Sequence, residues 1–177
     1  MSEGLDLYYW DACIFYEWLK DEPVDRLMKQ QVQHILRENK EKRNKICTSV
    51  IMHLEVLPKK VGRDEEIKYM GNFSSLHFFD IELDRNILSL AREIKDYYYE
   101  EKTETETYKI MSTGDSIQLA TAIIHDATEF HTRDNKKKGG NVPLLTLCQT
   151  SPNGKICGKY SLKIVSPIAY QGDLLDS

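Results

Sequence analysis

The chain has 177 residues, of which 41% are hydrophobic and 29% are charged, a composition that excludes an intrinsically disordered protein. Its formal net charge of −4 excludes a global field that attracts nucleic acid or an anionic membrane, so nucleic-acid binding would need a local basic patch. No stretch approaches the roughly 20 apolar residues that span a bilayer, so no membrane association is expected.

Short apolar runs alternate with longer amphipathic segments along the chain. Residues 5–10 predict a first strand, and residues 12–22 predict a helix that Pro23 ends. Residues 24–45 predict an amphipathic helix whose last turns carry solvated charge. The beginning of the chain therefore predicts one strand followed by two helices.

The middle of the chain repeats this alternation. Residues 46–57 open as a strand and then predict a helix that Thr48 or Ser49 can cap. Residues 76–83 predict a third strand, and residues 84–100 predict a strongly amphipathic helix. Strands that alternate with helices in this way indicate βαβ units.

The last part of the chain completes the pattern. Residues 101–109 predict a polar loop or a helix extension, and residues 113–127 predict a buried helix rich in Ala and Ile. Residues 128–132 predict a fourth strand. The turn-rich stretch 149–160 leads to a fifth strand at residues 161–165.

The alternation predicts an α/β fold in three layers, with a central, mostly parallel sheet of about five strands flanked by helices. We expect a single domain over residues 1–170 and a frayed C-terminal tail over residues 171–177.

The four cysteines form no CxxC pair, which favours a reducing, cytoplasmic compartment. Cys13 and Cys47 lie in apolar runs and are predicted to be small buried side chains. Cys148 and Cys157 can flank a hairpin or share a metal, but no His at ligand spacing supports the metal.

Carboxylates follow two of the predicted strands. Asp11 comes after the first strand and Asp134 after the fourth, and open parallel sheets bind ligands at the carboxyl ends of their strands. Asp115, in the first turn of a buried helix, can point to the same end. Glu55 lies on the buried side of its helix, where an ionisable group needs compensation. Because four carboxylates at one edge would repel one another, they predict a divalent cation, and oxygen-only ligands suit Mg²⁺ or Mn²⁺.

Each acid also has an explanation that needs no metal. Asp115 complements the helix dipole, and Asp11 and Asp134 suit turns or helix caps. Glu55 can pair with Lys59 one turn on. The joint placement of the four acids, rather than any one of them, therefore carries the prediction of a metal site.

Three stretches together resemble the PIN-domain family of metal-dependent ribonucleases: YYWDACIFYEWL, TSVIMHLEVL and STGDSIQLATAIIHDATEFHTRD. The family pattern has an apolar strand that ends in Asp, a Ser/Thr-led helix that carries Glu, and an Ala-rich helix that begins with Asp and leads to a T-x-D strand end. The resemblance covers most of the chain and falls, in order, on Asp11, Glu55, Asp115 and Asp134.

The resemblance implies a PIN-like fold and a Mg²⁺- or Mn²⁺-dependent endoribonuclease that hydrolyses single-stranded RNA. The four acids would bind the metal and carry catalysis, Glu55 through water or by orienting the nucleophile. Thr132 and Asn135 would support the loop of Asp134 or a metal-bound water. Lysines contact phosphates with little sequence information, so nucleic-acid binding is expected from the basic run Lys136, Lys137 and Lys138.

The resemblance also implies partners, since relatives commonly dimerise and include toxins of toxin–antitoxin pairs. A homodimer and an antitoxin-like protein inhibitor are therefore expected besides RNA. Two departures stand out. Ala12 follows the first Asp where many relatives carry Ser or Thr, and the connections 100–113 and 148–159 are longer than compact members need. A stand-alone nuclease fits this chain as well as a toxin does.

Alternatives stay open beside an RNA-cleaving enzyme. One is a non-catalytic PIN-like module that binds RNA or protein, and another is a nuclease of the same fold that acts on DNA or a flap. All four acid positions are filled, which favours an enzyme. A haloacid-dehalogenase-like phosphatase is disfavoured because it needs a second Asp where Cys13 stands. A receiver domain is disfavoured because Lys163 lies within the last predicted strand.

Overall fold

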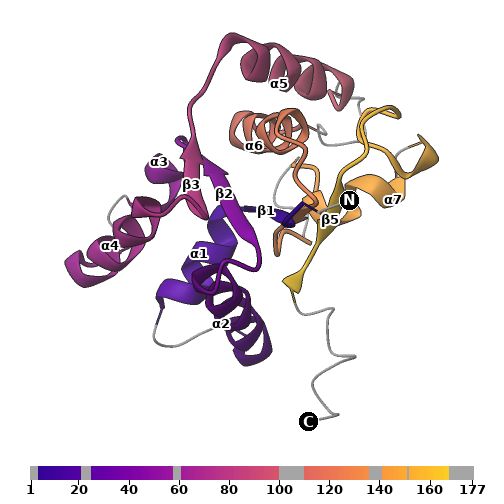
Figure 1. The fold of residues 1–177 in the computed structure, drawn as a ribbon. Helices are drawn as coiled ribbons and strands as arrows, with labels where there is room; N and C mark the ends of the chain where they lie inside the picture. Colours follow the sequence, from indigo (N-terminus) through magenta and orange to yellow (C-terminus); the bar gives the residue numbers. More distant parts are fainter. Residues whose placement is uncertain are drawn as a thin grey trace, which may run out of the picture.

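The computed structural model describes residues 4–20, 25–57, 61–99, 110–135, 141–150 and 152–167. In this part of the chain five strands form one sheet in the order β3-β2-β1-β4-β5, and every neighbouring pair is parallel (Figure 1). The prediction of a central parallel sheet of about five strands is confirmed. The strands are β1 (Leu7–Trp10), β2 (Lys45–Ser49), β3 (Phe78–Ile81), β4 (Glu129–His131) and β5 (Lys163–Val165).

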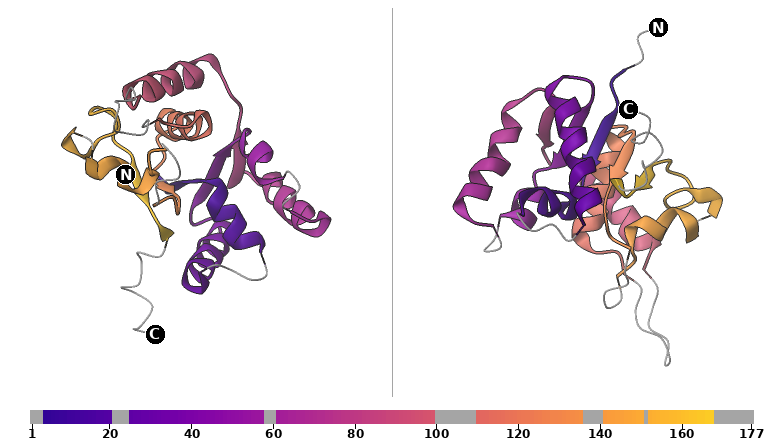
Figure 2. Two further views of the ribbon diagram at one scale, coloured as in Figure 1. Left: turned by 180° about the vertical axis from the view of Figure 1, so that it is seen from behind. Right: turned by 90° about the horizontal axis from the view of Figure 1, so that it is seen from below.

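Helices cover both faces of the sheet, which gives the three predicted layers (Figures 1 and 2). One face carries α1 (Ala12–Leu19), α2 (Arg26–Lys40), α3 (Met52–Val56) and α4 (Arg63–Met70). The other face carries α5 (Arg85–Tyr97), α6 (Thr113–Ile124) and α7 (Leu144–Thr150). Short 3₁₀ turns follow at η1 (Gly71–Ser74) and η2 (Pro152–Gly154). None of the helices in the described ranges is long and apolar enough to cross a membrane.

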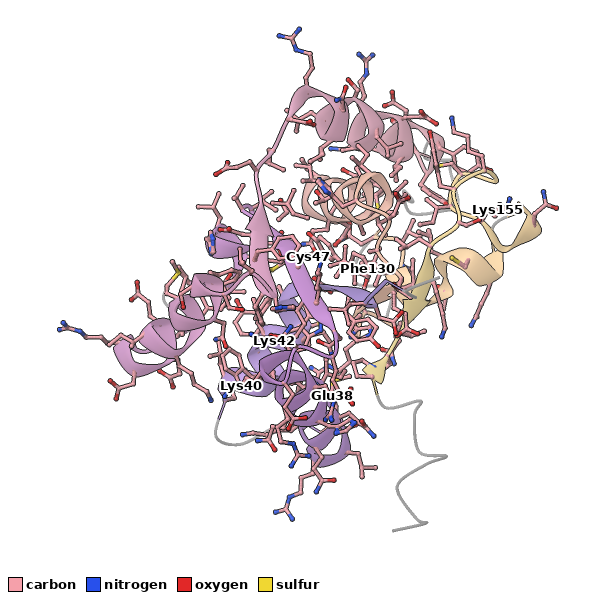
Figure 3. The ribbon with its side chains drawn as sticks, viewed as in Figure 1. Glu38, Lys40, Lys42, Cys47, Phe130 and Lys155 are labelled. Atoms are coloured by element: carbon pink, nitrogen blue, oxygen red, sulfur yellow. The ribbon has the colours of Figure 1, made fainter. Side chains whose placement is uncertain are left out.

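Two hydrophobic cores lie on opposite faces of the sheet because successive residues of a strand point to opposite sides. Tyr9 packs into the core below α5, α6 and α7, where its ring stacks on Phe130 with centroids 5.0 Å apart. Its neighbour Trp10 packs into the core below α1 to α4. Figure 3 labels Cys47 and Phe130 near the middle of the sheet.

The start of α3 differs from the prediction that Thr48 or Ser49 caps this helix. Both residues belong to β2, and α3 begins at Met52 without a side-chain cap. The hydroxyl of Thr48 instead donates a hydrogen bond to the carbonyl oxygen of Trp10, at 3.0 Å. The buried hydroxyl of Thr48 thus bonds to the neighbouring strand β1 and not to the start of α3.

Two helices are absent from the sequence-based prediction. Helix α4 buries one side chain, Tyr69, so it shows no apolar periodicity. Helix α7 is seven residues long, and the N–H groups of Leu144 and Leu145 donate to Asp134, a partner ten or more residues away. The predicted helix 24–45 is also too long, because Lys42 has a positive φ of 60° and the helix ends at Lys40.

Several predictions fall on residues outside the described ranges. These are the polar stretch 101–109, the lysine run 136–138 and the end of the chain from residue 168. The single domain over 1–170 and the frayed tail over 171–177 therefore stay predictions.

Replacing Phe130 by Ala should cost about 3–5 kcal/mol of unfolding free energy, because it removes a fully buried ring from the centre of one core. Urea unfolding followed by circular dichroism measures this. The matched control is Leu76→Ala, whose side chain is 91% exposed and should change stability little. Equal losses from both substitutions would contradict the assignment of Phe130 to the core.

Candidate functional site

Asp11 lies where β1 ends and α1 begins. Its backbone N–H donates to the carbonyl of His131 on β4, at 3.1 Å, so the end of one strand is tied to the end of its neighbour. It is the N-cap of α1, and its Oδ1 accepts from the N–H of Ala12 at 2.6 Å. The structural explanation of Asp11 as a helix cap therefore holds for one of its two oxygens.

The second oxygen of Asp11 faces the polar groups of the site. Oδ2 accepts from the hydroxyl of Thr132 at 2.6 Å and from the thiol of Cys13 at 3.1 Å. Burial raises the pKa of Asp11, and these hydrogen bonds oppose the rise. The prediction that Cys13 is a small buried side chain is wrong, because the residue is partly exposed and its sulfur also accepts from the N–H of Arg133 at 3.0 Å. Ala12 has no hydroxyl to offer at this position. The side-chain donors to Asp11 are Thr132 and Cys13 instead.

Asp115 lies in the first turn of α6, next to the N-cap Ser112. The hydroxyl of Ser112 accepts from the backbone N–H of Asp115 at 2.9 Å and donates to its Oδ2 at 2.6 Å. Burial raises the pKa of Asp115 to about 6, and the charges of Asp11 and Asp134 add to that effect. The hydroxyl of Ser112 thus orients the carboxyl group of Asp115, whose charged form is disfavoured by burial and by the neighbouring acids.

Glu55 lies on α3, between the buried residues Met52 and Val56. Its Oε2 accepts from the side-chain amide of Gln118 on α6, at 2.9 Å. Burial, followed by repulsion from Asp11 and Asp115, raises the pKa of Glu55 to about 7. This carboxyl group therefore keeps its proton to a higher pH than a solvent-exposed Glu does.

Asp134 follows β4, and its side chain contacts the start of α7. Its N–H donates to the hydroxyl of Thr132 at 3.1 Å, and its Oδ2 accepts from the N–H of Leu144 at the start of α7, at 3.2 Å. Thr132 therefore bridges Asp11 and Asp134. The charge of Asp134 adds to the effect of burial on the pKa values of Asp11 and Asp115.

The structure brings the four acids to one edge of the sheet, where their charges act on one another. Of the side chains that the structure describes, no cationic one is among the groups that lower the pKa values of Asp11, Glu55 and Asp115. Within the described ranges, no three His, Cys, Asp or Glu side chains already meet in the geometry of a metal site. The arrangement is a loose acidic cluster whose repulsion a hard divalent cation would offset.

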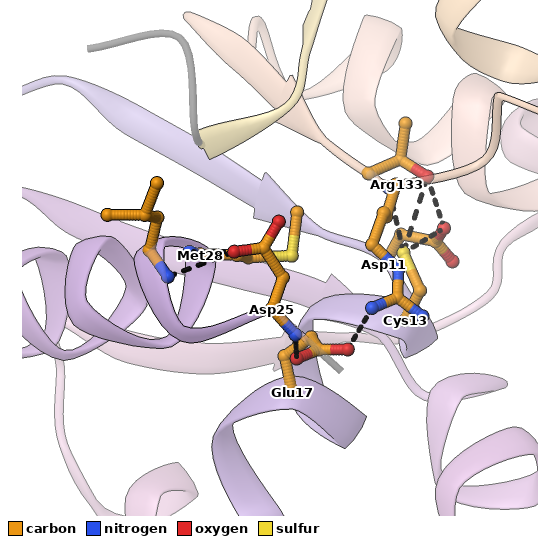
Figure 4. A network of polar contacts seen from close by, with 8 residues as sticks. Asp11, Cys13, Glu17, Asp25, Met28 and Arg133 are labelled. Carbon is orange, nitrogen blue, oxygen red and sulfur yellow. Dashed lines mark hydrogen bonds and ion pairs between the residues drawn. The ribbon is translucent and has the colours of Figure 1, made fainter. Parts of the chain in front are cut away.

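A buried ion pair holds the segment after β4 against α1 (Figure 4). The guanidinium of Arg133 donates to Oε1 of Glu17, whose side chain is 3% exposed, while Oε2 of Glu17 accepts from the N–H of Asp25 at 3.3 Å. Because a buried carboxylate is costly without a partner, Arg133 is bound to α1 rather than free to face the acids. Among the described residues, the cation nearest Asp134 in sequence therefore pairs with Glu17 and not with the acids.

The other predicted site residues follow Asp134 directly in the sequence. Asn135 is exposed, and Lys136, Lys137 and Lys138 lie outside the described ranges. A second basic stretch, residues 40–45, ends at the opposite edge of the sheet from Asp11, since Lys45 is paired with Leu7 at the start of β1. Figure 3 shows Lys40 and Lys42 at the end of α2, and Lys155 on the side of α7.

Three residues at the site escaped the sequence analysis as contributors: Ser112, Cys13 and Gln118. The S-x-x-D spacing of Ser112 and Asp115 resembles a capping box and was a usable signal. Gln118 gave no distinct signal, because Ser116 and Thr121 are polar residues of the same buried helix. Cys13 gave no signal, because its contacts depend on a segment about 120 residues away.

Comparison with known proteins gives two findings and one negative result. No curated protein matches the chain. One similar solved structure is a toxin-antitoxin complex from Klebsiella pneumoniae, with 19% sequence identity, a TM-score of 0.46, and coverage of 76% of this chain and 95% of that chain. The family model described as PIN domain matches residues 8–138. Because this match spans well over half of the sequence and ends beyond the last of the four acids, the chain belongs to the PIN domain family.

Proposed function

We propose that this protein is a Mg²⁺- or Mn²⁺-dependent endoribonuclease that hydrolyses phosphodiester bonds of single-stranded RNA. The observation that carries the proposal is the acidic cluster, in which Glu55 and Asp115 have pKa values raised to about 7 and about 6 by burial and by neighbouring carboxylates. Groups perturbed in this way concentrate at functional sites. Membership of the PIN domain family supports the same chemistry.

The donor set fits a hard divalent cation. Asp11, Glu55, Asp115 and Asp134 offer carboxylate oxygens only, the ligands that suit Mg²⁺ and Mn²⁺. Burial and mutual repulsion make the charged forms of Glu55 and Asp115 unfavourable in the protein alone. A bound cation would relieve this repulsion, which favours cation binding. The sulfur of Cys13 is committed to Asp11 and Arg133 and adds no reason to favour zinc.

The chain's own groups then have separate tasks. A divalent cation supplies Lewis-acid chemistry, which lowers the pKa of a water and offsets charge on the phosphate oxygens. Asp11 and Asp134 would hold the ion, and the hydroxyl of Thr132 fixes both relative to each other. Asp115 would hold it from the opposite helix layer, oriented by Ser112. Glu55 would hold the ion through a water and orient that water for attack, since its carboxyl group exchanges a proton near neutral pH.

The finer parts of the proposal concern contacts with other molecules. Lys136, Lys137 and Lys138 follow Asp134 by a few residues and would bind the RNA backbone, which predicts a strong dependence of affinity on salt. A homodimer and an antitoxin-like inhibitor complete the proposal. Light scattering of the purified protein tests the dimer directly.

Substituting Asp115 by Asn should abolish cleavage of single-stranded RNA, because the amide cannot supply the charge that the ion needs. We expect a loss larger than the roughly 10- to 100-fold that follows removal of a residue that only supports a ligand. The assay is cleavage of a mixed RNA pool in Mn²⁺ or Mg²⁺, with EDTA in parallel. Asp64→Asn, on the exposed first turn of α4, is the matched control and should leave activity unchanged.

The outcomes of this assay separate the alternatives. Cleavage that persists in EDTA and in Asp115→Asn would contradict the proposal. A preference for single-stranded DNA or a flap would assign the same fold to a DNA-directed nuclease. Binding of Mn²⁺ without cleavage of any nucleic acid would indicate a non-catalytic module.

Metal-free protein should lose stability as pH rises from about 4.5 to about 7, since folding raises the pKa of Glu55 from its usual 4.5 to about 7. The native state holds this proton more tightly than the unfolded chain, so its stabilising effect is complete below pH 4.5 and lost above pH 7. Melting in EDTA at a series of pH values measures this, with Glu55→Gln as the variant that should reduce the slope. Part of the slope remains, because the pKa of Asp115 is also raised, to about 6. Mn²⁺ should raise the melting temperature more above pH 7 than below pH 5. Identical pH profiles for the wild type and Glu55→Gln would refute the assignment.

A further inference from the structure

The carboxylate of Glu55 packs against the neighbouring helix α6. Two residues of α6 one turn apart, Gly114 and Gln118, lie against its two oxygens. The amide nitrogen of Gln118 donates to Oε2 at 2.9 Å. A Cβ atom added at Gly114 would stand 2.5 Å from Oε1, closer than real Cβ atoms approach. Between them lies Asp115, which repels Glu55.

Gln118 is a polar residue at a costly position. Its side chain is 1% exposed, on a stretch of α6 where Leu119, Ala120 and Ala122 are fully buried. Its Oε1 is buried without a hydrogen-bond partner among the described residues. A buried amide with an unmatched oxygen destabilises the fold compared with an apolar residue. In return, the amide group of Gln118 supplies the hydrogen bond to Glu55.

Gly114 is likewise not explained by the helix that contains it. Its φ is not positive, so its backbone does not require glycine. Within a helix, Ala is more favourable than Gly. What the position lacks is a side chain, and the space left free is the space that Oε1 of Glu55 occupies.

The backbone below Glu55 is anchored separately. His53 on the same short helix contacts the hydroxyl of Tyr69 at 3.0 Å and the carboxylate of Asp80 at 2.8 Å. Because these contacts hold the backbone of α3, only the direction of the Glu55 side chain remains to be fixed. Two nearby like charges would turn a free carboxylate away from the cluster.

We propose that Gly114 and Gln118 are positioning residues that hold the Glu55 carboxylate beside Asp11 and Asp115, one by leaving room and the other by donating a hydrogen bond. This inference rests on the proposed function and adds the device that assembles its site. Since the atom in the way is the end of a flexible side chain, a methyl group at position 114 displaces the carboxylate and not the backbone.

The test is a set of double-mutant cycles read by calorimetric Mn²⁺ binding, by melting temperature and by cleavage kinetics. Gly114→Ala and Gln118→Met should each weaken Mn²⁺ binding about 10-fold or more, as loss of a supporting contact does. In a Glu55→Ala background neither substitution should change Mn²⁺ affinity, because nothing remains to be positioned. Gly71→Ala, where an added Cβ meets nothing within 4 Å, and Gln33→Met, on an exposed position of α2, are the matched controls.

Stability separates positioning from a structural role. The melting temperature of metal-free Gly114→Ala should equal or exceed that of the wild type while kcat falls about 10-fold and KM for RNA stays unchanged. A parallel fall in melting temperature and affinity, or equal effects with and without Glu55, would overturn the inference. Wild-type protein that binds Mn²⁺ but cuts no RNA would overturn the proposed function alone. The Mn²⁺-binding cycles would still test whether Gly114 and Gln118 position Glu55. Wild-type protein that binds no Mn²⁺ would overturn both.

Discussion

Parallel pairing of the strands concentrates negative charge at one edge of this protein. Because β1 and β4 are neighbours and run in the same direction, the residues that follow them, Asp11 and Asp134, meet at the same edge. Helices from the two opposite faces add Glu55 and Asp115. Burial and repulsion then act together, and each raises the free energy of the charged forms. The local structure around the site is best understood as a response to this repulsion.

Each carboxylate is held by a different donor, and each donor comes from a different level of structure. Asp115 is held by the cap of its own helix, and Asp134 accepts an N–H from the first turn of a helix ten residues later. Asp11 is held by a strand-end hydroxyl about 120 residues away. These neutral donors orient the acids without cancelling their charge, whereas the buried pair of Arg133 and Glu17 keeps a guanidinium occupied. The acids are thus oriented while their mutual repulsion remains.

Long side chains need more support than short ones. An Asp carboxylate stays close to its backbone, so the ends of strands and helices are enough to place it. Glu55 extends further and lies on a helix of five residues that has no side-chain cap. Its position therefore depends on the facing surface of α6, where Gly114 leaves space and Gln118 donates a hydrogen bond. The shape of one helix thus completes a site whose charge comes from another.

Sequence alone determined the alternation of strands and helices, the parallel sheet and the order of the four acids, because apolar periodicity and strand-end residues are local signals. It did not reveal α4, which buries one residue, or α7, whose first N–H groups bond to Asp134. It also placed the helix cap wrongly at Thr48 or Ser49, since both lie in β2 and the hydroxyl of Thr48 bonds across the sheet. The roles of Cys13 and Gln118 were decided by tertiary structure only, since each acts on a carboxylate through contacts that exist after distant segments pack together.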